Sequence, residues 1–188
     1  MTARPVFLDA NVLVPVSLTD LLLRLAELGL LEPFWSPRVL ADATKAVQTR
    51  RPDLNPAAVR RRFASMAAAF PDAMVGEDGL DLTDYSSPDP DGRLVIGAAH
   101  RSPARTIITR NLPHFPEAGL ARHGLSAQSP DSLLLDLLAS QPGTLRQALN
   151  GLRSDLRNPP LAMDEILGNL ADAGVPDFAD QARRLFFG

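Results

Sequence analysis

The chain has 188 residues, of which 45% are hydrophobic and 22% charged, and its formal net charge is −3. This length suits one well-buried domain with a short appendage and is too small for two independent cores. No apolar run approaches the roughly 18 residues that a membrane span requires, and the first residues lack an apolar signal core, so we expect a cytoplasmic protein without a membrane partner.

Short apolar strands alternate with helices in the first two thirds of the chain. A buried strand is expected at Val6–Leu8, and leucines at helical spacing follow it until Gly29 ends the pattern. A capping residue followed by proline marks a helix start three times, at Ser36, Asp89 and Ser129. The remaining expected elements are helices Pro37–Val47, Pro56–Phe70 and Pro90–His100 and strands Asp72–Val75, Thr106–Ile108 and Leu125–Gln128. This alternation predicts an α/β fold with a central parallel sheet covered on both faces.

After Asp131 the pattern predicts helices only. They are expected at Leu133–Leu138, Leu145–Leu156, Met163–Ala171 and Phe178–Phe187, with breaks at Pro142, Asn158-Pro159-Pro160 and Gly174-Val175-Pro176. A unit of roughly 45 residues is too small to fold alone. We therefore expect a sheet domain over residues 1–140 and a helical extension over residues 141–188 that packs on the core or on a partner.

Oxygen-bearing side chains gather where an open parallel sheet binds ligands, at the carboxyl ends of its strands. They are Asp9 and Asn11 after the first strand, Thr109 and Asn111 after the Thr106 strand, and Asp89 and Asp91 at the start of the Pro90 helix. The chain has no cysteine, so any metal must be held by oxygen or imidazole ligands. The alternative reading is structural, since Asp9 and Asp89 can simply cap the helices that follow them.

A cluster of basic residues lies between residues 45 and 62, with Asp53 as its only acid. Such a stripe can follow the phosphates of RNA, although composition alone favours a solvated helix face. Its members are Lys45, Arg50, Arg51, Arg60, Arg61 and Arg62.

Four motifs in order carry a family resemblance. They are FLDANVL (Phe7–Leu13), WSPRVLAD (Trp35–Asp42), DPDGRLVIGAA (Asp89–Ala99) and TIITRNLPHFP (Thr106–Pro116). In order and spacing they resemble the motifs of PIN domains, and the tail is similar to the helical extension of one branch of VapC-like ribonuclease toxins. The resemblance implies a PIN-like three-layer fold, with a central parallel sheet between helices and a C-terminal helical appendage.

The resemblance also implies hydrolysis of RNA phosphodiester bonds by Mg²⁺ or Mn²⁺ held on carboxylates. Asp9 matches the aspartate of the first motif, and Asn11 its asparagine. Asn111 and Thr109 match the polar positions of the last motif. The implied catalytic residues are Asp9, Asp42, Asp91 and Asn111, the implied metal ligands are Asp9, Asp42 and Asp91, and the supporting residues are Asn11, Thr109 and Asp89.

Three positions depart from the family pattern. Asp42 stands where the family carries glutamate, Gly92 replaces the aspartate of the third motif, and His114 replaces an aspartate of the last motif. Asp91 and Asp89 are close enough in sequence to substitute for the lost acid. We expect Gly92→Asp to be tolerated, because acids are favoured in a first helical turn, and to tighten Mn²⁺ binding.

Three functions remain to be compared. The first is a ribonuclease toxin with a degenerate site, restrained by a small antitoxin protein and, as in the family, a homodimer. The second is a catalytically inactive PIN protein that serves as a binding or regulatory module. The third, a haloacid dehalogenase type phosphohydrolase, requires a second acid at Asn11 and a late lysine, whereas the single lysine is Lys45.

Overall fold

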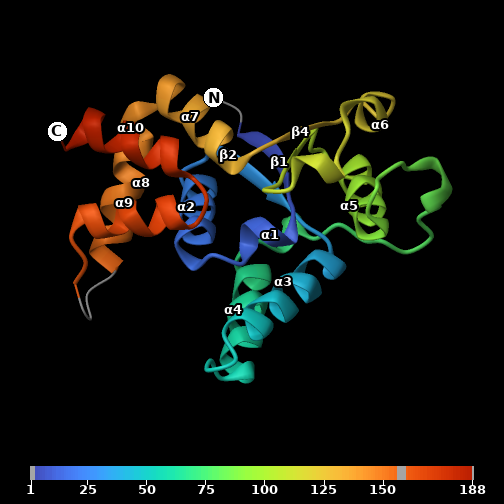
Figure 1. Ribbon diagram of the computed structural model, residues 1–188, viewed down its shortest axis with the longest axis horizontal. Helices are drawn as coiled ribbons and strands as arrows, with labels where there is room; N and C mark the ends of the chain where they lie inside the picture. The colour runs from blue at the N-terminus through green and yellow to red at the C-terminus, as the bar shows by residue number, and fades with distance from the viewer. Residues whose placement is uncertain (1–2, 156–159, 188) are drawn as a thin grey trace.

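A sheet of four parallel strands in the order β2-β1-β3-β4 forms the centre of the computed structural model, which describes residues 3–155 and 160–187 (Figure 1). Strand β1 (Arg4–Leu8) pairs with β2 (Leu31–Phe34) on one side and with β3 (Thr106–Ile108) on the other, and β4 (Ser126–Gln128) lies at the far edge. Val6, Phe7 and Leu8 of β1 are fully buried because helices cover both faces of the sheet. The predicted α/β fold is confirmed.

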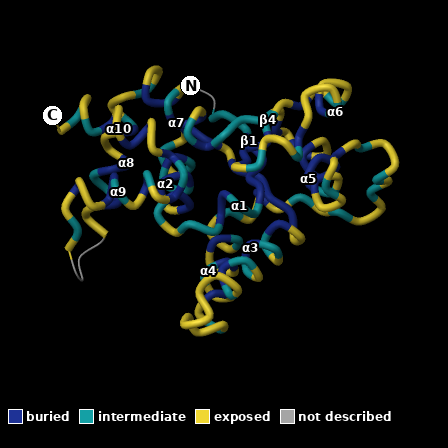
Figure 2. Tube along the Cα trace, viewed as in Figure 1, coloured by how far each residue is buried: buried dark blue, intermediate teal, exposed yellow. Residues whose placement is uncertain are grey.

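Helices flank this sheet on either side. In Figure 1, α2 lies with the helices of the tail at the left, α5 and α6 lie at the right, and the α3–α4 pair projects away from the sheet. Figure 2 shows the tip of that pair as exposed and β1 as buried. The helices are α1 (Ala10–Leu13), α2 (Val16–Glu27), α3 (Pro37–Arg50), α4 (Pro56–Ala69), α5 (Pro90–Arg101), α6 (Glu117–Ala121), α7 (Pro130–Ser140), α8 (Pro142–Asp155), α9 (Met163–Asp172) and α10 (Pro176–Phe186).

The three predicted helix starts are all made by the expected side chains. Ser36 accepts a hydrogen bond from the amide of Val39, and Ser129 accepts one from the amide of Ser132. Asp89 caps α5 in the same way. At the other end of a helix, Gly29 takes a φ of 75° just after α2, a conformation that glycine adopts without steric cost. These local signals explain why the helix boundaries were predictable.

Two sheet elements differ from the prediction. The strand expected at Asp72–Val75 is wrong, because Pro71 begins a short 3-10 helix (Pro71–Ala73) and only Met74 pairs with the sheet, in an isolated bridge to Trp35. Strand β2 was not predicted. Its sequence, LEPF, is short and contains a proline, which the sheet accommodates because β2 is at the edge of the main ladder.

The helices after β4 pack against α2 and against one another. Arg24 of α2 forms an ion pair with Asp155 of α8, and Ser17 Oγ donates to the carbonyl oxygen of Asn169 at 3.2 Å. The carboxylate of Asp131, in the first turn of α7, accepts hydrogen bonds from two backbone amides at the start of α10. The tail is thus fastened to the sheet domain at both of its ends.

Parts of two expected features lie outside the described residues: Leu156, the expected end of the second tail helix, and Asn158 and Pro159 of the expected break. Across residues 3–155 and 160–187, no helix combines the length and apolar character needed to cross a bilayer.

Candidate active site

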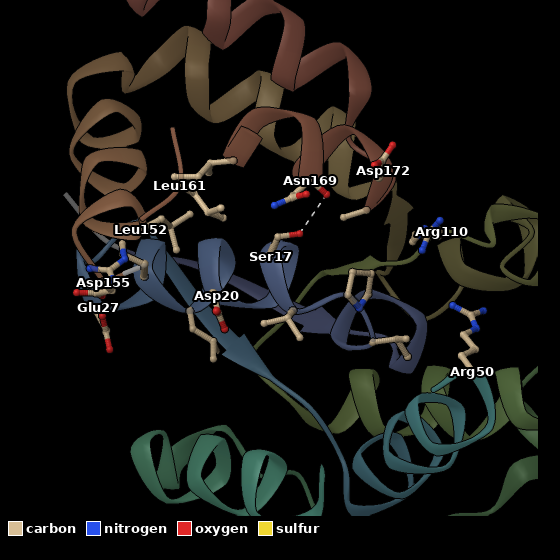
Figure 3. Close-up of a pocket in the computed structure, with 17 residues that line it drawn as sticks. Ser17, Asp20, Glu27, Arg50, Arg110, Leu152, Asp155, Leu161, Asn169 and Asp172 are labelled. Carbon is tan, nitrogen blue, oxygen red and sulfur yellow. Dashed lines mark hydrogen bonds and ion pairs between the residues drawn. The ribbon is translucent and has the colours of Figure 1, made fainter. Parts of the chain in front are cut away.

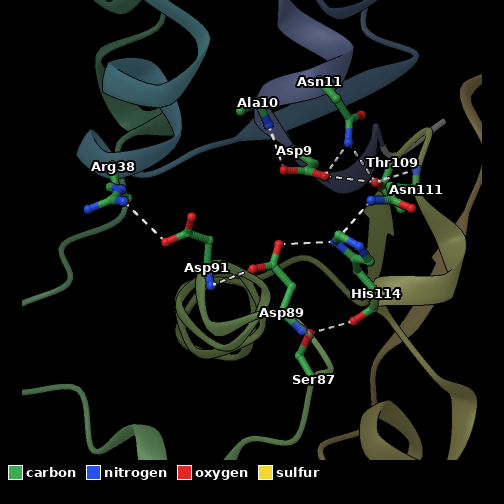
Figure 4. Close-up of polar contacts among 10 residues, drawn as sticks. All are labelled: Asp9, Ala10, Asn11, Arg38, Ser87, Asp89, Asp91, Thr109, Asn111 and His114. Carbon is green, nitrogen blue, oxygen red and sulfur yellow. Dashed lines mark hydrogen bonds and ion pairs between the residues drawn. The ribbon is translucent and has the colours of Figure 1, made fainter. Parts of the chain in front are cut away.

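The carboxylate of Asp9 is the centre of a hydrogen-bond network at the carboxyl end of β1. Its Oδ1 accepts from the backbone amide of Ala10 at 2.7 Å. Its Oδ2 accepts from Asn11 Nδ2 at 2.6 Å and from Thr109 Oγ1 at 2.7 Å (Figure 4). Asp9 therefore caps α1, as the structural alternative anticipated, but it is also bonded to a residue of the neighbouring strand end.

Burial raises the pKa of Asp9 above the ordinary aspartate value, while hydrogen bonds from Thr109, Ala10 and Asn11 favour the charged form and limit the rise. Three of the roughly four acceptor positions of a carboxylate are thus occupied by the protein. One position remains for a further donor or a cation, which would offset the cost of burying this charge.

The ends of β1 and β3 are joined by the same network. Asn11 Oδ1 accepts from the amide of Arg110 at 2.9 Å, and Thr109 Oγ1 accepts from the amide of Asn111 at 3.0 Å. Thr109 is fully buried. The structure therefore brings together Asp9, Asn11, Thr109 and Asn111, which the sequence placed after two different strands.

A hollow of about 250 Å³ opens beside this network. All four sequence motifs contribute to its lining, because the β1 and β3 ends, the start of α5 and one side of α3 meet around it. The polar residues that line it are Asp9, Asn11, Arg50, Asp42, Asp89, Asp91, Asn111 and His114.

Arg38 binds the two acids on the α3 side of the hollow. Its Nε donates to Asp42 at 2.9 Å and its Nη2 donates to Asp91 at 3.1 Å. The bond and charge of Asp42, followed by the charge of Asp91, raise the pKa of Arg38 above its ordinary value. Asp42 and Asp91, two of the three predicted metal ligands, thus bind the Arg38 guanidinium. They are not bonded to Asp9 or to one of its partners in the network. All three of these side chains are partly exposed, so the ion pairs are weak enough for a competing cation to replace them.

His114 faces Asp89 on the opposite side. Its Nδ1 lies 3.0 Å from Asp89 Oδ2 and 2.9 Å from the amide nitrogen position of Asn111. Because a carboxylate only accepts, the contact with Asp89 is satisfied when Nδ1 carries the proton. Asp89 also caps α5 through the amide of Asp91 at 3.2 Å. The histidine that departs from the family pattern is therefore paired with a nearby acid.

Gly92 corrects one expectation. A Cβ at this position would overlap Ser87 Oγ and lie 3.0 Å from Ser87 Cβ. Ser87 Oγ is itself engaged, since it donates to the carbonyl oxygen of His114 at 2.7 Å and accepts from the amide of Asp89 at 3.1 Å. The prediction that Gly92→Asp fits without cost is wrong, because Ser87 fills the space that the new side chain needs. Nothing in the sequence pattern pointed to Ser87.

Comparison with known proteins agrees with this architecture. Residues 130–184 match the family model described as the VapC50 C-terminal domain. The chain is also 37% identical over 94 residues to the "Putative ribonuclease VapC50" of Mycobacterium tuberculosis (strain ATCC 25618 / H37Rv). Over these residues the chain is similar to VapC50 proteins. The match covers 50% of this chain and 55% of that relative's length, and no solved structure matches.

The acids of this site do not surround one point. Within the part of the chain that the structure describes, no three Asp, Glu or His side chains are grouped closely enough to hold a metal ion. The donor set fits a different kind of site, in which Mg²⁺ or Mn²⁺ keeps most of its waters and binds one or two carboxylates. Asp9, with one acceptor position left, and the weakly paired Asp91 have the right chemistry for it.

The residues of the basic stripe lie in different surroundings. Arg62 is partly buried and donates to the carbonyl oxygens of Leu13 and Val14, and its burial lowers its pKa. Arg51 is paired with Asp53. Arg50 lines the acidic hollow, while the other three members, Lys45, Arg60 and Arg61, are exposed and line none of the hollows described here.

Proposed function

We propose that this VapC-like protein is a metal-dependent endoribonuclease of the toxin class of type II toxin–antitoxin systems, with a weakened acidic site. The observation that carries the proposal is the Asp9 network, in which a buried carboxylate is bonded across two strand ends and faces a hollow lined by further acids. Such an arrangement suits a divalent cation because Asp9 keeps one acceptor position that these protein donors leave open, and the neighbouring acids are held only by partly exposed ion pairs. Similarity to a relative named as a ribonuclease supports the reaction class.

Asp9, with Asp91 and in a supporting role Asp89, would hold a hydrated Mg²⁺ or Mn²⁺ ion, and Asp42 becomes available when Arg38 moves away. When bound, the ion supplies a polarised water and neutralises charge on the scissile phosphate. Thr109 and Asn11 keep the Asp9 carboxylate in one orientation. Asn111, whose backbone is fixed by Thr109, presents its amide to the hollow and is suited to position the phosphate.

The proposal includes the partners expected for this class, namely RNA, a small antitoxin protein and a second copy of the chain, with a cytoplasmic location. It also includes the division into a PIN-like domain, residues 1–140, and a helical extension, residues 141–188. The matched family model begins at residue 130, so α7 is grouped with the extension in that match. The bond from Asp131 to the start of α10 is consistent with either assignment of α7.

The test is cleavage of a fluorescently labelled RNA with and without Mn²⁺, together with calorimetric titration of Mn²⁺. We expect slow cleavage that EDTA abolishes and that Asp9→Asn removes. Asp72→Asn is the matched control, because Asp72 is exposed and lines none of the hollows. Absence of both metal binding and cleavage in the wild type would overturn the proposal.

One observation favours the second candidate, a VapC-like protein that binds without catalysis. Arg38 already neutralises Asp42 and Asp91, and Ser87 occupies the space beside Gly92. If this candidate is correct, Arg38→Ala and wild type will both bind RNA and neither will cleave it. Cleavage that increases in Arg38→Ala would instead show that the guanidinium suppresses a competent site.

A further inference from the structure

Two arginines stand where the acidic hollow meets a larger groove. The groove has a volume of about 820 Å³ and lies between α2 and the tail helices α8 and α9 (Figure 3). Arg50, the last residue of α3, lines both the hollow and the groove, and Arg110 lines the groove. Both are exposed. The two side chains thus border the passage between the two spaces.

Arg110 is fixed to the active site through its backbone. Its amide donates to Asn11 Oδ1 at 2.9 Å, within the network that holds Asp9, and its neighbours in sequence are Thr109 and Asn111. Arg110, which lines the groove, therefore adjoins Asn111, which lines the acidic hollow.

The side chain of Arg110 is held by packing against the α9–α10 turn. A Cβ on Gly174 would lie 2.7 Å from Arg110 Nε and 3.1 Å from its Cζ, and Gly174 has a φ of 100°. Both facts require glycine at this position. The α9–α10 turn of the tail therefore packs against the guanidinium. This packing positions an exposed arginine without an ion pair.

Neither guanidinium is neutralised by the protein. Nearby arginines are engaged: Arg24 with Asp155, Arg38 with two acids, and Arg62 with backbone carbonyls. In residues 3–155 and 160–187, by contrast, no side-chain hydrogen bond or ion pair is made by Arg50 or Arg110. A guanidinium of this kind is suited to bind a phosphate through two parallel N–H donors.

We propose that Arg50 and Arg110 clamp the phosphate backbone of a single RNA strand beside the acidic hollow. Gly174 of the extension packs against Arg110 and positions its side chain. This inference rests on the proposed ribonuclease function and identifies where its substrate is held. The physical reason is electrostatic. The hollow contains four aspartates, so phosphates that flank one neutralised by a metal ion need cations at its rim. The two arginines supply that charge, and the tail acquires a role in substrate binding. The groove also contains four acids, Asp20, Glu27, Asp155 and Asp172, so the clamp is limited to the end of the groove that the two arginines border.

The experiment measures binding of a fluorescein-labelled single-stranded RNA by anisotropy, in EDTA to prevent cleavage and at increasing KCl. The variants are Arg50→Ala, Arg110→Ala and the double variant. The matched controls are Arg146→Ala and Arg184→Ala, which remove the same charge from exposed positions that line none of the hollows. We expect each site variant to raise Kd about tenfold or more, as loss of a charge-assisted hydrogen bond does. Each should also lower the salt slope by roughly 0.7, the value for one phosphate of a single strand.

Several results would overturn the clamp. They are no RNA binding by the wild type, site variants that match the two controls, and an equal loss of affinity for a poly-glutamate peptide, which would indicate an acidic protein ligand. The cleavage assay separates this inference from the proposed function. If cleavage persists unchanged in Arg110→Ala, the clamp is refuted and the proposed nuclease function stands. If RNA binding depends on both arginines but no cleavage occurs, the clamp is supported and the proposed nuclease function is refuted.

Discussion

Replacing Gly92 by alanine should destabilise the protein, although alanine is the residue most favoured inside a helix. Gly92 lies in the first turn of α5 and has no positive φ, so its backbone accepts any residue. The new Cβ would meet Ser87, whose Oγ bonds to His114 and to Asp89. The change therefore tests whether Ser87 is held firmly in the space beside Gly92.

The expected magnitude follows from three contributions. Exchanging glycine for alanine in a helix gains about 1 kcal/mol. Overpacking against Ser87 costs roughly 1 to 3 kcal/mol, and displacing its hydroxyl costs about 0.5 to 1.5 kcal/mol for each of the two hydrogen bonds. The net loss is therefore about 1 to 5 kcal/mol, centred near 3 kcal/mol. At roughly 2 to 4 °C per kcal/mol for a chain of this size, the central value lowers the Tm by about 6 to 12 °C.

A double-mutant cycle separates this clash from other effects. In the Ser87→Gly background the obstruction is absent, so Gly92→Ala should become neutral or stabilising. Gly92→Asp in that background should also tighten Mn²⁺ binding, measured by calorimetry, whereas Gly92→Asp alone should unfold at a lower urea concentration. If Gly92→Ala is as stable as the wild type in both backgrounds, Ser87 moves aside freely and the reasoning about the filled space is refuted.

Three further outcomes are expected. Arg62→Ala should lower the free energy of unfolding in urea by about 1 to 3 kcal/mol, because it leaves buried carbonyl groups unsatisfied. The control Arg61→Ala should change it by less than about 0.5 kcal/mol. Equal effects of the two substitutions would contradict a structural role for Arg62 and favour its role in RNA binding. Burial raises the folded-state pKa of Asp9, so the folded state binds the extra proton and wild-type stability falls as pH rises from the ordinary aspartate range through that pKa. Asp9→Asn should lack this fall, and parallel pH profiles of the two proteins would contradict the assignment. Arg38→Ala should tighten Mn²⁺ binding by freeing two carboxylates, and weaker binding would mean that the guanidinium organises the site.

The sequence predicted the contacts of the site that lie at the ends of strands. A parallel sheet brings its carboxyl ends to one edge, so the positions of Asp9 and Thr109 in their motifs were enough to predict that they meet. The bond between Thr109 Oγ1 and Asp9 confirms this, and Asn11 joins the same network. The helix starts were predictable for a similar reason, because each cap lies within three residues of the amide that it serves.

The remaining contacts of the site could not be predicted, because no local sequence rule determines which side chains meet across distant segments. Arg38 reaches Asp91 across 53 residues of sequence, and Ser87 meets Gly92 because the loop before α5 folds back on the helix. These contacts are set by rotamers and loop packing, not by spacing. The wrong strand at Asp72–Val75 has a local cause, since Pro71 begins a 3-10 turn in a stretch too short to show a period.

The bond between Thr109 and Asp9 also has a consequence for how the chain is made. The two residues are 100 positions apart, and strands β1 and β3 are parallel, so the pairing is non-local and cannot form until both strands have been made. At about 5 to 20 residues per second, a ribosome needs on the order of 5 to 20 seconds after Asp9 before residue 109 is made. Until then the carboxylate lacks its hydroxyl donor, and the hollow lacks Asn111 and His114. A nascent or truncated chain therefore has no assembled site, and any nuclease activity belongs only to molecules whose synthesis has passed the third strand.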